Sequence, residues 1–352
     1  MRWLAVALLV ACGGGGGGTS KVAHPKQDAV DEKQAEKDAR GLVTEVYATL
    51  GRGTKDSLFS LLDASLVVFG PRKSDALGSR TETLVALGTV INPKDKLAVR
   101  SSSLEVVASP GGRSAWAFDL VTIAGEPHAM LAILINTDDM WQVEAAVIAQ
   151  TPSRGTVRSE LARDAIVPPG ASAKAKLDST AKGAVDRFHK GLLDQDVWGA
   201  DLGSRSDALY VGPSIGEVTR GKKELKKLWK KRSEAKLREA ESGDLVAGAT
   251  PDGQLAWVSA PVTRVDDDAP EPLPLRAFAV FERAGDGWKL IALHESLAID
   301  EPGAGAPFRK LAPPKEPEKK IEAADDKPAK AAHVKKKKKK TKKKKKPVAD
   351  DE

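Results

Sequence analysis

The sequence predicts an α+β fold made of two tandem units, each an opening helix followed by a curved antiparallel sheet. Three observations predict it. The 352 residues are 41% hydrophobic and 30% charged, which is typical of a soluble protein with room for about two domains. A set of landmarks occurs twice along the chain. Each copy opens with a helical pattern and continues with short strands, so each copy is expected to form one α+β unit.

The landmarks are three kinds of segment that recur in the same order. They are an apolar run that stops at Gly-Pro, a turn that leads into Ala-Trp, and a polar hairpin that closes at Trp. The matching segments are 66–71 with 208–213, 110–116 with 251–257, and 131–141 with 278–288. Their offsets are 142, 141 and 147 residues. Offsets within six residues of one another indicate an internal repeat.

Apolar residues at helical spacing predict one opening helix in each repeat. They are Val43, Val46, Tyr47 and Leu50 in the first, and Ala181, Ala184, Val185, Phe188 and Leu192 in the second. Short apolar runs between Pro-Gly, Asp-Gly or Asp-Asp turns predict the strands. We therefore place a first domain at residues 28–150, a linker at 151–176 and a second domain at 177–300.

The amino-terminal segment has the pattern of a processing signal. An apolar stretch, Leu4–Ala11, ends in Leu9-Val10-Ala11-Cys12, and six glycines follow. This box resembles a bacterial lipoprotein signal, which implies cleavage after residue 11 and lipid on Cys12. Residues 12–27 would then be a flexible tether. Gly13 after the cysteine favours the outer membrane, so the resemblance implies a lipid-anchored protein of the cell envelope. As the only cysteine, Cys12 excludes an intramolecular disulfide.

The second repeat resembles the SnoaL-like group of the nuclear transport factor 2-like superfamily. The matching segments are 209–213, Arg220-Gly221, 255–258, 275–278 and 287–296. The first repeat resembles the same SnoaL-like sequence pattern, but more weakly. The resemblance implies a cone-shaped α+β barrel with a pocket between helices and sheet. Because members of the superfamily include isomerases, dehydratases and proteins without a known reaction, the resemblance does not fix the function.

The alternation of side chains between the two faces of a strand predicts which residues line a pocket in the second repeat. Trp288, Leu290, Ala292, His294 and Ser296 are expected on one face, as are Arg276, Phe278 and Val280. If these faces line the concavity, Arg276 could clamp an acidic ligand and His294 could transfer a proton. Tyr210, Trp257 and Ser296 complete the candidate pocket. The alternative is that Arg276, His294 and Tyr210 are satisfied structural residues.

The first repeat lacks both polar candidates, because Ala129 takes the place of Arg276 and Val147 that of His294. His128, one residue away, is expected on the opposite face. We therefore expect the first repeat to be structural or to bind an apolar ligand. The chain has no Gly-rich phosphate loop, nucleophile elbow or metal-spaced histidine pair, so neither a metal nor a cofactor is expected.

Two segments are strongly basic. A helix is predicted at 220–232 (RGKKELKKLWKKR), whose lysines form either a solvated face or a contact with an anionic surface. Residues 301–352 carry a net charge of +9, against −2 for the rest of the chain, and are expected to be disordered. Their lysines, from Lys335 to Lys340 and from Lys342 to Lys346, would attract anionic envelope polymers or serve only solubility.

These observations favour a non-enzymatic envelope lipoprotein that binds a ligand or serves as a scaffold. The resemblance implies that its two domains pack on each other as an intramolecular pseudo-dimer. One alternative is an isomerase- or dehydratase-type acid–base enzyme that uses His294 and Arg276 on a small acidic substrate. A second alternative is a polyanion-binding protein that acts through its lysine tail.

Overall fold

The computed structural model describes residues 31–70, 76–88, 97–154, 157, 179–234, 245–264 and 273–297. All of them belong to one compact body within Met1–Pro313. Cys12, the glycine tether, most of the linker and the lysine tail lie outside the described residues. Below, the first unit means the described residues up to 154, and the second unit means those from 179 to 297.

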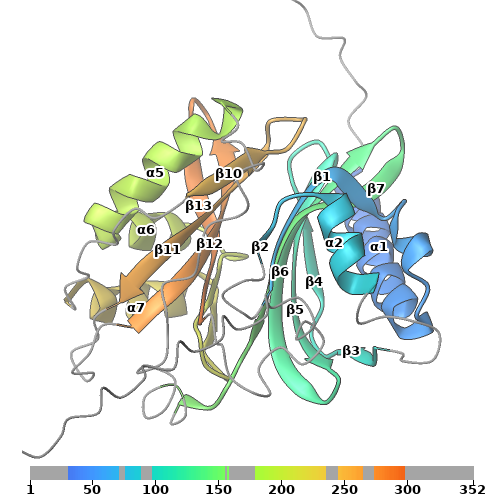
Figure 1. Ribbon diagram of the computed structural model, residues 1–352. Coiled ribbons are helices and arrows are strands. Elements are labelled where there is room, and N and C mark those ends of the chain that lie inside the picture. The colour runs from blue at the N-terminus through green and yellow to red at the C-terminus, as the bar shows by residue number, and fades with distance from the viewer. Residues whose placement is uncertain are drawn as a thin grey trace, which may run out of the picture. The chain divides into compact units, whose positions relative to one another are not determined.

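The first unit contains three helical segments and seven strands (Figure 1). The helical segments are α1 (Glu32–Arg52), η1 (Lys55–Leu58) and α2 (Arg80–Gly88). The strands are β1 (Leu62–Phe69), β2 (Ala76–Leu77), β3 (Val99–Ser101), β4 (Glu105–Ala108), β5 (Ser114–Ile123), β6 (Glu126–Thr137) and β7 (Met140–Gln150).

The second unit contains four helical segments and six strands. The helical segments are η3 (Ser179–Ala181), α5 (Lys182–Leu193), α6 (Gln195–Leu202) and α7 (Lys222–Glu234). The strands are β8 (Leu209–Val211), β9 (Val218–Arg220), β10 (Val246–Ala249), β11 (Leu255–Arg264), β12 (Leu273–Ala284) and β13 (Gly287–Ser296). The opening helices predicted in both repeats are thus confirmed as α1 and α5. The sequence analysis missed α2 and α6.

Helix α1 shows how local chemistry sets the ends of these elements. The side chain of Asp31 accepts a hydrogen bond from the backbone N–H of Lys33, 3.0 Å away, and so caps the first turn. At the other end Gly53 adopts φ 74°, a left-handed conformation that glycine reaches without strain. Its N–H donates to the carbonyl oxygens of Leu50 and Thr49, which closes the helix.

The α+β fold class is confirmed, with one curved sheet and its helices in each unit. The first sheet has the order β2-β1-β7-β6-β5-β3, with β4 also paired to β5, and the second has the order β10-β11-β12-β13-β8-β9. Most neighbouring strands are antiparallel, as predicted, but β1 pairs with β7 and β8 pairs with β13 in parallel. Neither parallel pair is joined by a hairpin, because long stretches of chain separate its two strands.

The internal repeat extends to the register of the strands. In the first sheet a bulge at Glu144 shifts the pairing of β7 with β6, and in the second a bulge at Ile291 shifts the pairing of β13 with β12. These two bulges lie 147 residues apart, which is the offset of the final hairpins in the sequence. A bulge reverses the side-chain alternation along its strand, so its position decides which residues face each side of the sheet.

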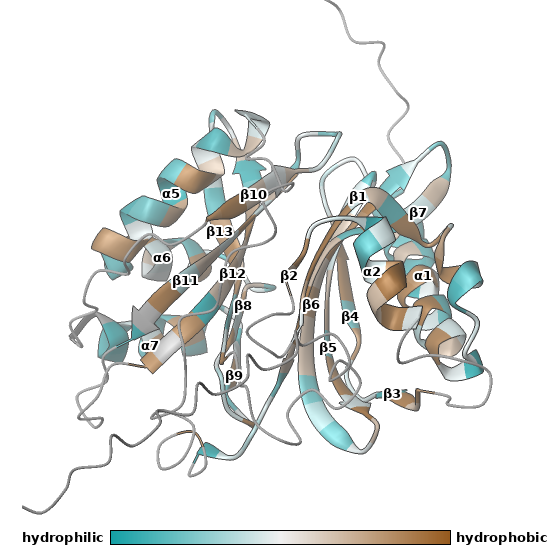
Figure 2. Ribbon diagram, in the orientation of Figure 1, coloured by the Kyte–Doolittle hydropathy of each residue, from teal (hydrophilic) through white to brown (hydrophobic). Residues whose placement is uncertain are grey.

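Each sheet has one face towards its own helices and one towards the other sheet. On the first helix-covered face, α1 and α2 pack on residues such as Met130, Ala132 and Leu134. On the second, α5, α6 and α7 pack on residues such as Ala279, Phe281 and Leu293. A third apolar cluster joins the two remaining faces and includes residues of both sheets. The helices show polar and apolar sides, as amphipathic helices do (Figure 2).

Candidate functional site

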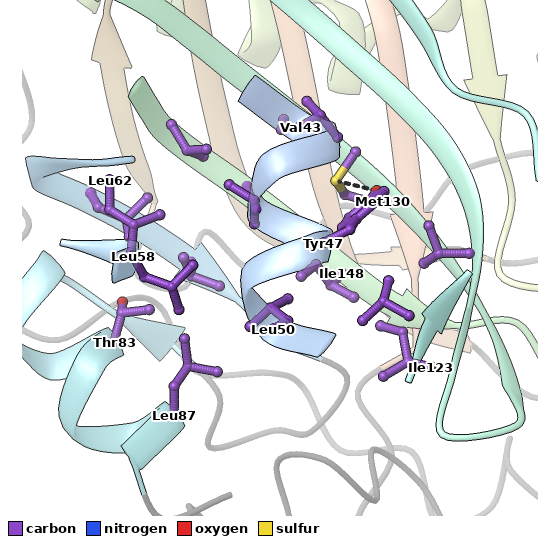
Figure 3. A pocket seen from close by; sticks show the side chains of 18 of the residues that line it. Val43, Tyr47, Leu50, Leu58, Leu62, Thr83, Leu87, Ile123, Met130 and Ile148 are labelled. Atoms are coloured by element: carbon purple, nitrogen blue, oxygen red, sulfur yellow. Dashed lines mark hydrogen bonds between the residues drawn. The ribbon is translucent and has the colours of Figure 1, made fainter. Parts of the chain in front are cut away.

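A cavity lies in the first unit between α1, α2 and the helix-covered face of the sheet (Figure 3). Its volume is about 100 Å³. Twenty-two residues line it, and all but Tyr47 and Thr83 are aliphatic residues or methionine. The wall includes Val43 and Leu50 from α1, Leu87 from α2, and Met130 and Ile148 from the sheet. The cavity is therefore suited to an apolar molecule.

The two hydroxyl groups at the cavity already make hydrogen bonds. The Tyr47 hydroxyl donates to Sδ of Met130, 3.3 Å away, as the dashed line in Figure 3 shows. Thr83 Oγ1 donates to the carbonyl oxygen of Ser79, 3.0 Å away. Because a thioether sulfur is a weak acceptor, the Tyr47 hydroxyl is the group that could most easily turn to a ligand.

An acidic residue lies beside this wall. Asp119 is fully buried on β5, directly opposite Met130 in the strand register and on the same helix-facing side. Its Oδ1 accepts from the backbone N–H of Ser103 at 2.9 Å. Burial raises the pKa of Tyr47, and the negative charge of Asp119 raises it further. Tyr47 therefore stays a neutral hydrogen-bond donor at all physiological pH values.

Aromatic rings fill the corresponding interior of the second unit. Phe188 and Trp198 lie with their ring centroids 5.3 Å apart, and Tyr210 and Trp229 pack edge to face at 5.5 Å. Trp198 lies against Gly191 of α5 so closely that a Cβ there would overlap the indole ring. The described aromatic side chains thus fill the interior of the second unit closely.

A charged network closes the same interior. Arg232 and Arg264 both bind the carboxylate of Glu295, with Nη to Oε distances of 2.7 and 3.2 Å, and the Tyr210 hydroxyl donates to Oε2 at 2.9 Å. Burial by itself would raise the pKa of Glu295, but the charges and hydrogen bonds of these partners lower it to about 2. Glu295 is therefore ionised and satisfied, as in a structural ion pair.

The structure divides the five predicted pocket residues between two faces. Tyr210 lies on the helix-covered face, bonded to Glu295. Trp257 belongs to the cluster between the sheets and stacks on Phe278 at 5.8 Å. The other three residues are Arg276, His294 and Ser296. Ser296 is buried at the end of β13, opposite Arg276 in the strand register.

Arg276 and His294 also face the first unit, so the expectation that they line the concavity is wrong. Arg276 donates from Nη1 to the carbonyl oxygen of Gly70 at 3.0 Å, and its guanidinium lies over the ring of Phe69. His294 pairs with Phe278 in the strand register and is 0% exposed. Neither ring nitrogen of His294 has a hydrogen-bond partner in the described part of the chain. Burial lowers its pKa to about 4.

The bulge at Ile291 is one reason for this error. Strict alternation puts Leu290 and His294 on one face, whereas the bulge leaves Leu290 towards the helices and Ala292 towards the first sheet. The other reason applies to β12 as well as β13. Both strands carry apolar residues on their two faces, so the sequence does not show which face the helices cover. A polar residue of this segment that does face the helices, Glu295, is adjacent to His294 in sequence.

Trp257 lines an open hollow between the two sheets, with a volume of about 560 Å³. Its indole N–H donates to Oε1 of Glu144 at 3.3 Å. Ser65 and Thr137, both exposed, lie at the rim, so solvent enters this hollow.

The first unit carries apolar residues where the second carries its polar pair. Leu131 pairs with Val147 in β6 and β7, as Phe278 pairs with His294, and Ala129 lies at the position of Arg276. His128 lies in the same strand phase as Met130 and is buried, with Nδ1 2.9 Å from the carbonyl oxygen of Glu126.

Sequence reasoning left apolar binding open for the first repeat, but it identified neither the residues that line the cavity nor Asp119. The sequence contains one indication of each feature. Asp119 is the one acidic residue in the apolar strand 114–123, and an acid in such a strand is often buried beside a specific partner. The apolar stripe of α1 was recognised, but the stripe does not reveal whether the space beneath it is filled.

Two further observations concern the described residues only. No group of three or more His, Cys, Asp or Glu residues there is arranged to hold a metal ion. Among the helices of the described ranges, none combines the length and the hydrophobicity that crossing a membrane requires.

Comparison with solved structures gives matches to about a third of the chain. A putative dehydratase of the NTF2-like family from Streptomyces avermitilis is 15% identical over 35% of this chain and 100% of its own, with a TM-score of 0.31. An NTF-2-like protein of unknown function from Silicibacter pomeroyi is 15% identical over 34% of this chain and 99% of its own, with a TM-score of 0.29. A search of curated proteins finds no match.

One family model matches the chain. It describes a SnoaL-like domain and covers residues 184–300, from within α5 to the end of β13 and just beyond. This range contains the helices α6 and α7 and the whole six-stranded sheet of the second unit. Residues 184–300 therefore form a SnoaL-like domain.

Proposed function

We propose that this chain is a non-enzymatic, lipid-anchored protein of the bacterial cell envelope whose first unit binds a small apolar ligand. The observation that carries the proposal is the apolar cavity of the first unit, whose counterpart region in the second unit is packed with aromatic rings. A SnoaL-like fold serves binding as well as catalysis, so the site decides between the two.

The size and chemistry of the cavity select the ligand. An apolar cavity of about 150 Å³ stays dry and binds benzene or xenon. At about 100 Å³ the cavity suits a ligand of similar size or the end of a longer aliphatic chain. The ligand would displace no ordered water from polar groups, because the hydroxyls of Tyr47 and Thr83 already have partners.

The lining favours binding over catalysis. General acid–base chemistry needs a titratable group within hydrogen-bond reach of the ligand. The lining residues include no acid, no histidine and no lysine, and the one titratable group, the phenol of Tyr47, has a raised pKa. The alternative enzyme in the second unit would depend on His294, which is 0% exposed and lies between the sheets.

The envelope location rests on the segment Leu9-Val10-Ala11-Cys12 and on the glycines that follow it. Several acyl chains on Cys12 would hold the protein on a membrane, at about 0.8 kcal/mol for each buried CH₂ group. Replacing Cys12 by Ser tests this part, with incorporation of a labelled fatty acid as the readout. Label on the unaltered chain and none on the variant is the expected result, whereas an unlabelled natural chain would contradict the anchor.

We also propose that the first unit is a second SnoaL-like domain and that the two units pair as an intramolecular pseudo-dimer. The shared strand order and the equivalent bulges at Glu144 and Ile291 support the first point. The apolar cluster that contains residues of both sheets supports the second. Binding of anionic envelope polymers by Lys335, Lys340, Lys342 and Lys346 stays a prediction.

Titration with benzene tests the binding function. We expect the melting temperature of the chain Gly13–Glu352 to rise with benzene concentration, because a ligand that binds only the native state stabilises it by mass action. Ala132 lines the cavity, so Ala132→Leu should fill it and remove the rise. Val85→Leu, at an exposed position of α2 outside the cavity, is the matched control and should keep it. A rise of equal size in Ala132→Leu would overturn the proposal.

A further inference from the structure

Helix α7 of the second unit presents an unusual density of positive charge to solvent. Six lysines are exposed along its thirteen residues: Lys222, Lys223, Lys226, Lys227, Lys230 and Lys231. The apolar side of the helix is turned into the unit, where Leu225 is 0% and Trp229 2% exposed. Arg232 also turns inward, to Glu295. The exposed surface, called the lysine face below, therefore offers charge and almost no apolar area.

Most of this charge is uncompensated. Within the described residues, five of the six lysines, all except Lys230, have no hydrogen-bonding or ion-pair partner. The arginines of these ranges, in contrast, are commonly paired, as Arg205 is with Asp207 at 2.6 Å and Arg220 with Glu105 at 2.7 Å. Lysines four residues apart on one helix repel each other, and α7 contains two such rows of three. A polyanionic partner would relieve this repulsion.

We infer that the lysine face binds the headgroups of anionic phospholipids, so that the second unit lies against a membrane surface. Thirteen helical residues span about 20 Å, which makes the two lysine rows a nearly straight array of charge. Such an array matches a flat anionic surface, where each lysine is attracted independently of the others. The inference adds a second membrane contact to the proposed lipid anchor, but its test does not depend on that anchor.

The composition of the face favours lipid over single-stranded nucleic acid. Proteins that bind single strands stack bases on exposed aromatic side chains, and the only aromatic residue of α7, Trp229, is buried. Without exposed apolar side chains among the lysines, the helix would contact headgroups and not insert between acyl chains. Binding should therefore weaken steeply as salt rises.

Vesicle binding by the unlipidated chain Gly13–Pro313 tests the inference. This chain omits Cys12 and the lysine tail but contains every described residue. We expect it to sediment with phosphatidylcholine vesicles that contain one-third phosphatidylglycerol, and not with pure phosphatidylcholine. The triple substitution Lys223→Gln, Lys227→Gln and Lys231→Gln should weaken this binding on the order of 100-fold, since each lysine near such a surface contributes about fivefold.

A charge-matched control separates the lysine face from net charge. Lys33, Lys37 and Lys289 are exposed and lie outside α7, so their triple change to Gln removes the same charge. The control should bind as tightly as the unaltered chain, and both variants should keep its melting temperature. Equal losses in both variants, or no binding to anionic vesicles, would overturn the inference. Tighter binding to duplex DNA than to the vesicles, lost in the α7 variant, would overturn it in favour of a nucleic-acid surface.

Discussion

Arg276 donates a hydrogen bond from Nη1 to the carbonyl oxygen of Gly70, 3.0 Å away and 206 residues earlier in the chain. Arg276 is 2% exposed, so this bond between β12 and the end of β1 is buried between the two sheets. A residue whose type and strand position indicated a ligand clamp thus serves to hold two parts of the protein together.

Replacement of Arg276 tests this structural role. Arg276→Ala should lower the free energy of unfolding by about 2–4 kcal/mol, because it leaves a buried carbonyl without its charged donor and empties space over Phe69. Urea denaturation measures the change. Arg283→Ala, an exposed arginine over the ring of Trp288, should cost less than about 1 kcal/mol. A loss no larger at Arg276 than at Arg283 would contradict the role.

Protonation of His294 should make stability depend on pH. In the unfolded chain histidine titrates near its ordinary pKa of about 6.5, whereas the pKa of folded His294 is lowered to about 4. The unfolded state therefore binds more protons between these pH values, and stability falls as the pH is lowered from about 6.5 to 4. The loss should be on the order of 3 kcal/mol.

Urea denaturation across this pH range checks the effect, with His294→Leu as the test variant. The variant should show a clearly shallower pH dependence, with the remainder due to buried His128, whose pKa burial also lowers, and, near the acid end of the range, to carboxyl groups such as Glu295, whose pKa is lowered to about 2. His189→Gln, at an exposed position of α5, is the control and should keep the full slope. An unchanged slope in His294→Leu would show that His294 does not stay neutral on folding.

The ion pairs of Glu295 with Arg232 and Arg264 should contribute more to the free energy of unfolding than an ion pair at the surface does. Glu295→Gln leaves Arg232 and Arg264 without a buried counter-charge, which should cost about 3–5 kcal/mol. Asp186→Asn, which breaks the exposed pair with Lys182, should cost less than about 0.5 kcal/mol. Both values come from urea denaturation at neutral pH. Similar small losses would mean that Glu295 is solvated and not held by the two arginines.

Substitution by alanine at two helical glycines should change the stability of the protein in opposite directions. Gly191→Ala should destabilise the protein by at least about 1–3 kcal/mol, because the new methyl group overlaps the indole of Trp198. Gly41 of α1 has no neighbouring atom within 4 Å of a new Cβ, so Gly41→Ala should stabilise by about 0.5–1 kcal/mol. Calorimetric melting temperatures give both signs. A stabilising Gly191→Ala would show that Trp198 does not pack on α5.

Patterns along the chain were enough to predict the two repeats, the opening helices and the long hairpins. Helix α1 follows from one apolar stripe and β6 from a long apolar run, and both signals are local. The orientation of β13 was not predictable in this way, because one bulge at Ile291 exchanges the two faces of the strand.

The candidate site was harder to predict for a related reason. A cavity is the difference between the space that the backbone encloses and the volume that side chains fill. Trp198 and Trp229 fill that space in the second unit, while residues such as Ala132 and Ala146 leave it open in the first. No single segment of sequence encodes that difference, so the sequence left two roles open for the first repeat, a structural one and the binding of an apolar ligand.

A crystal of the chain Gly13–Glu352 under xenon pressure tests the central claim most directly. Xenon enters dry apolar cavities, so the account predicts xenon density among Tyr47, Leu58 and Met130, beneath α1. Xenon found only elsewhere in the protein, or water in place of xenon at this position, would contradict the claim that the first unit holds a binding cavity for apolar molecules.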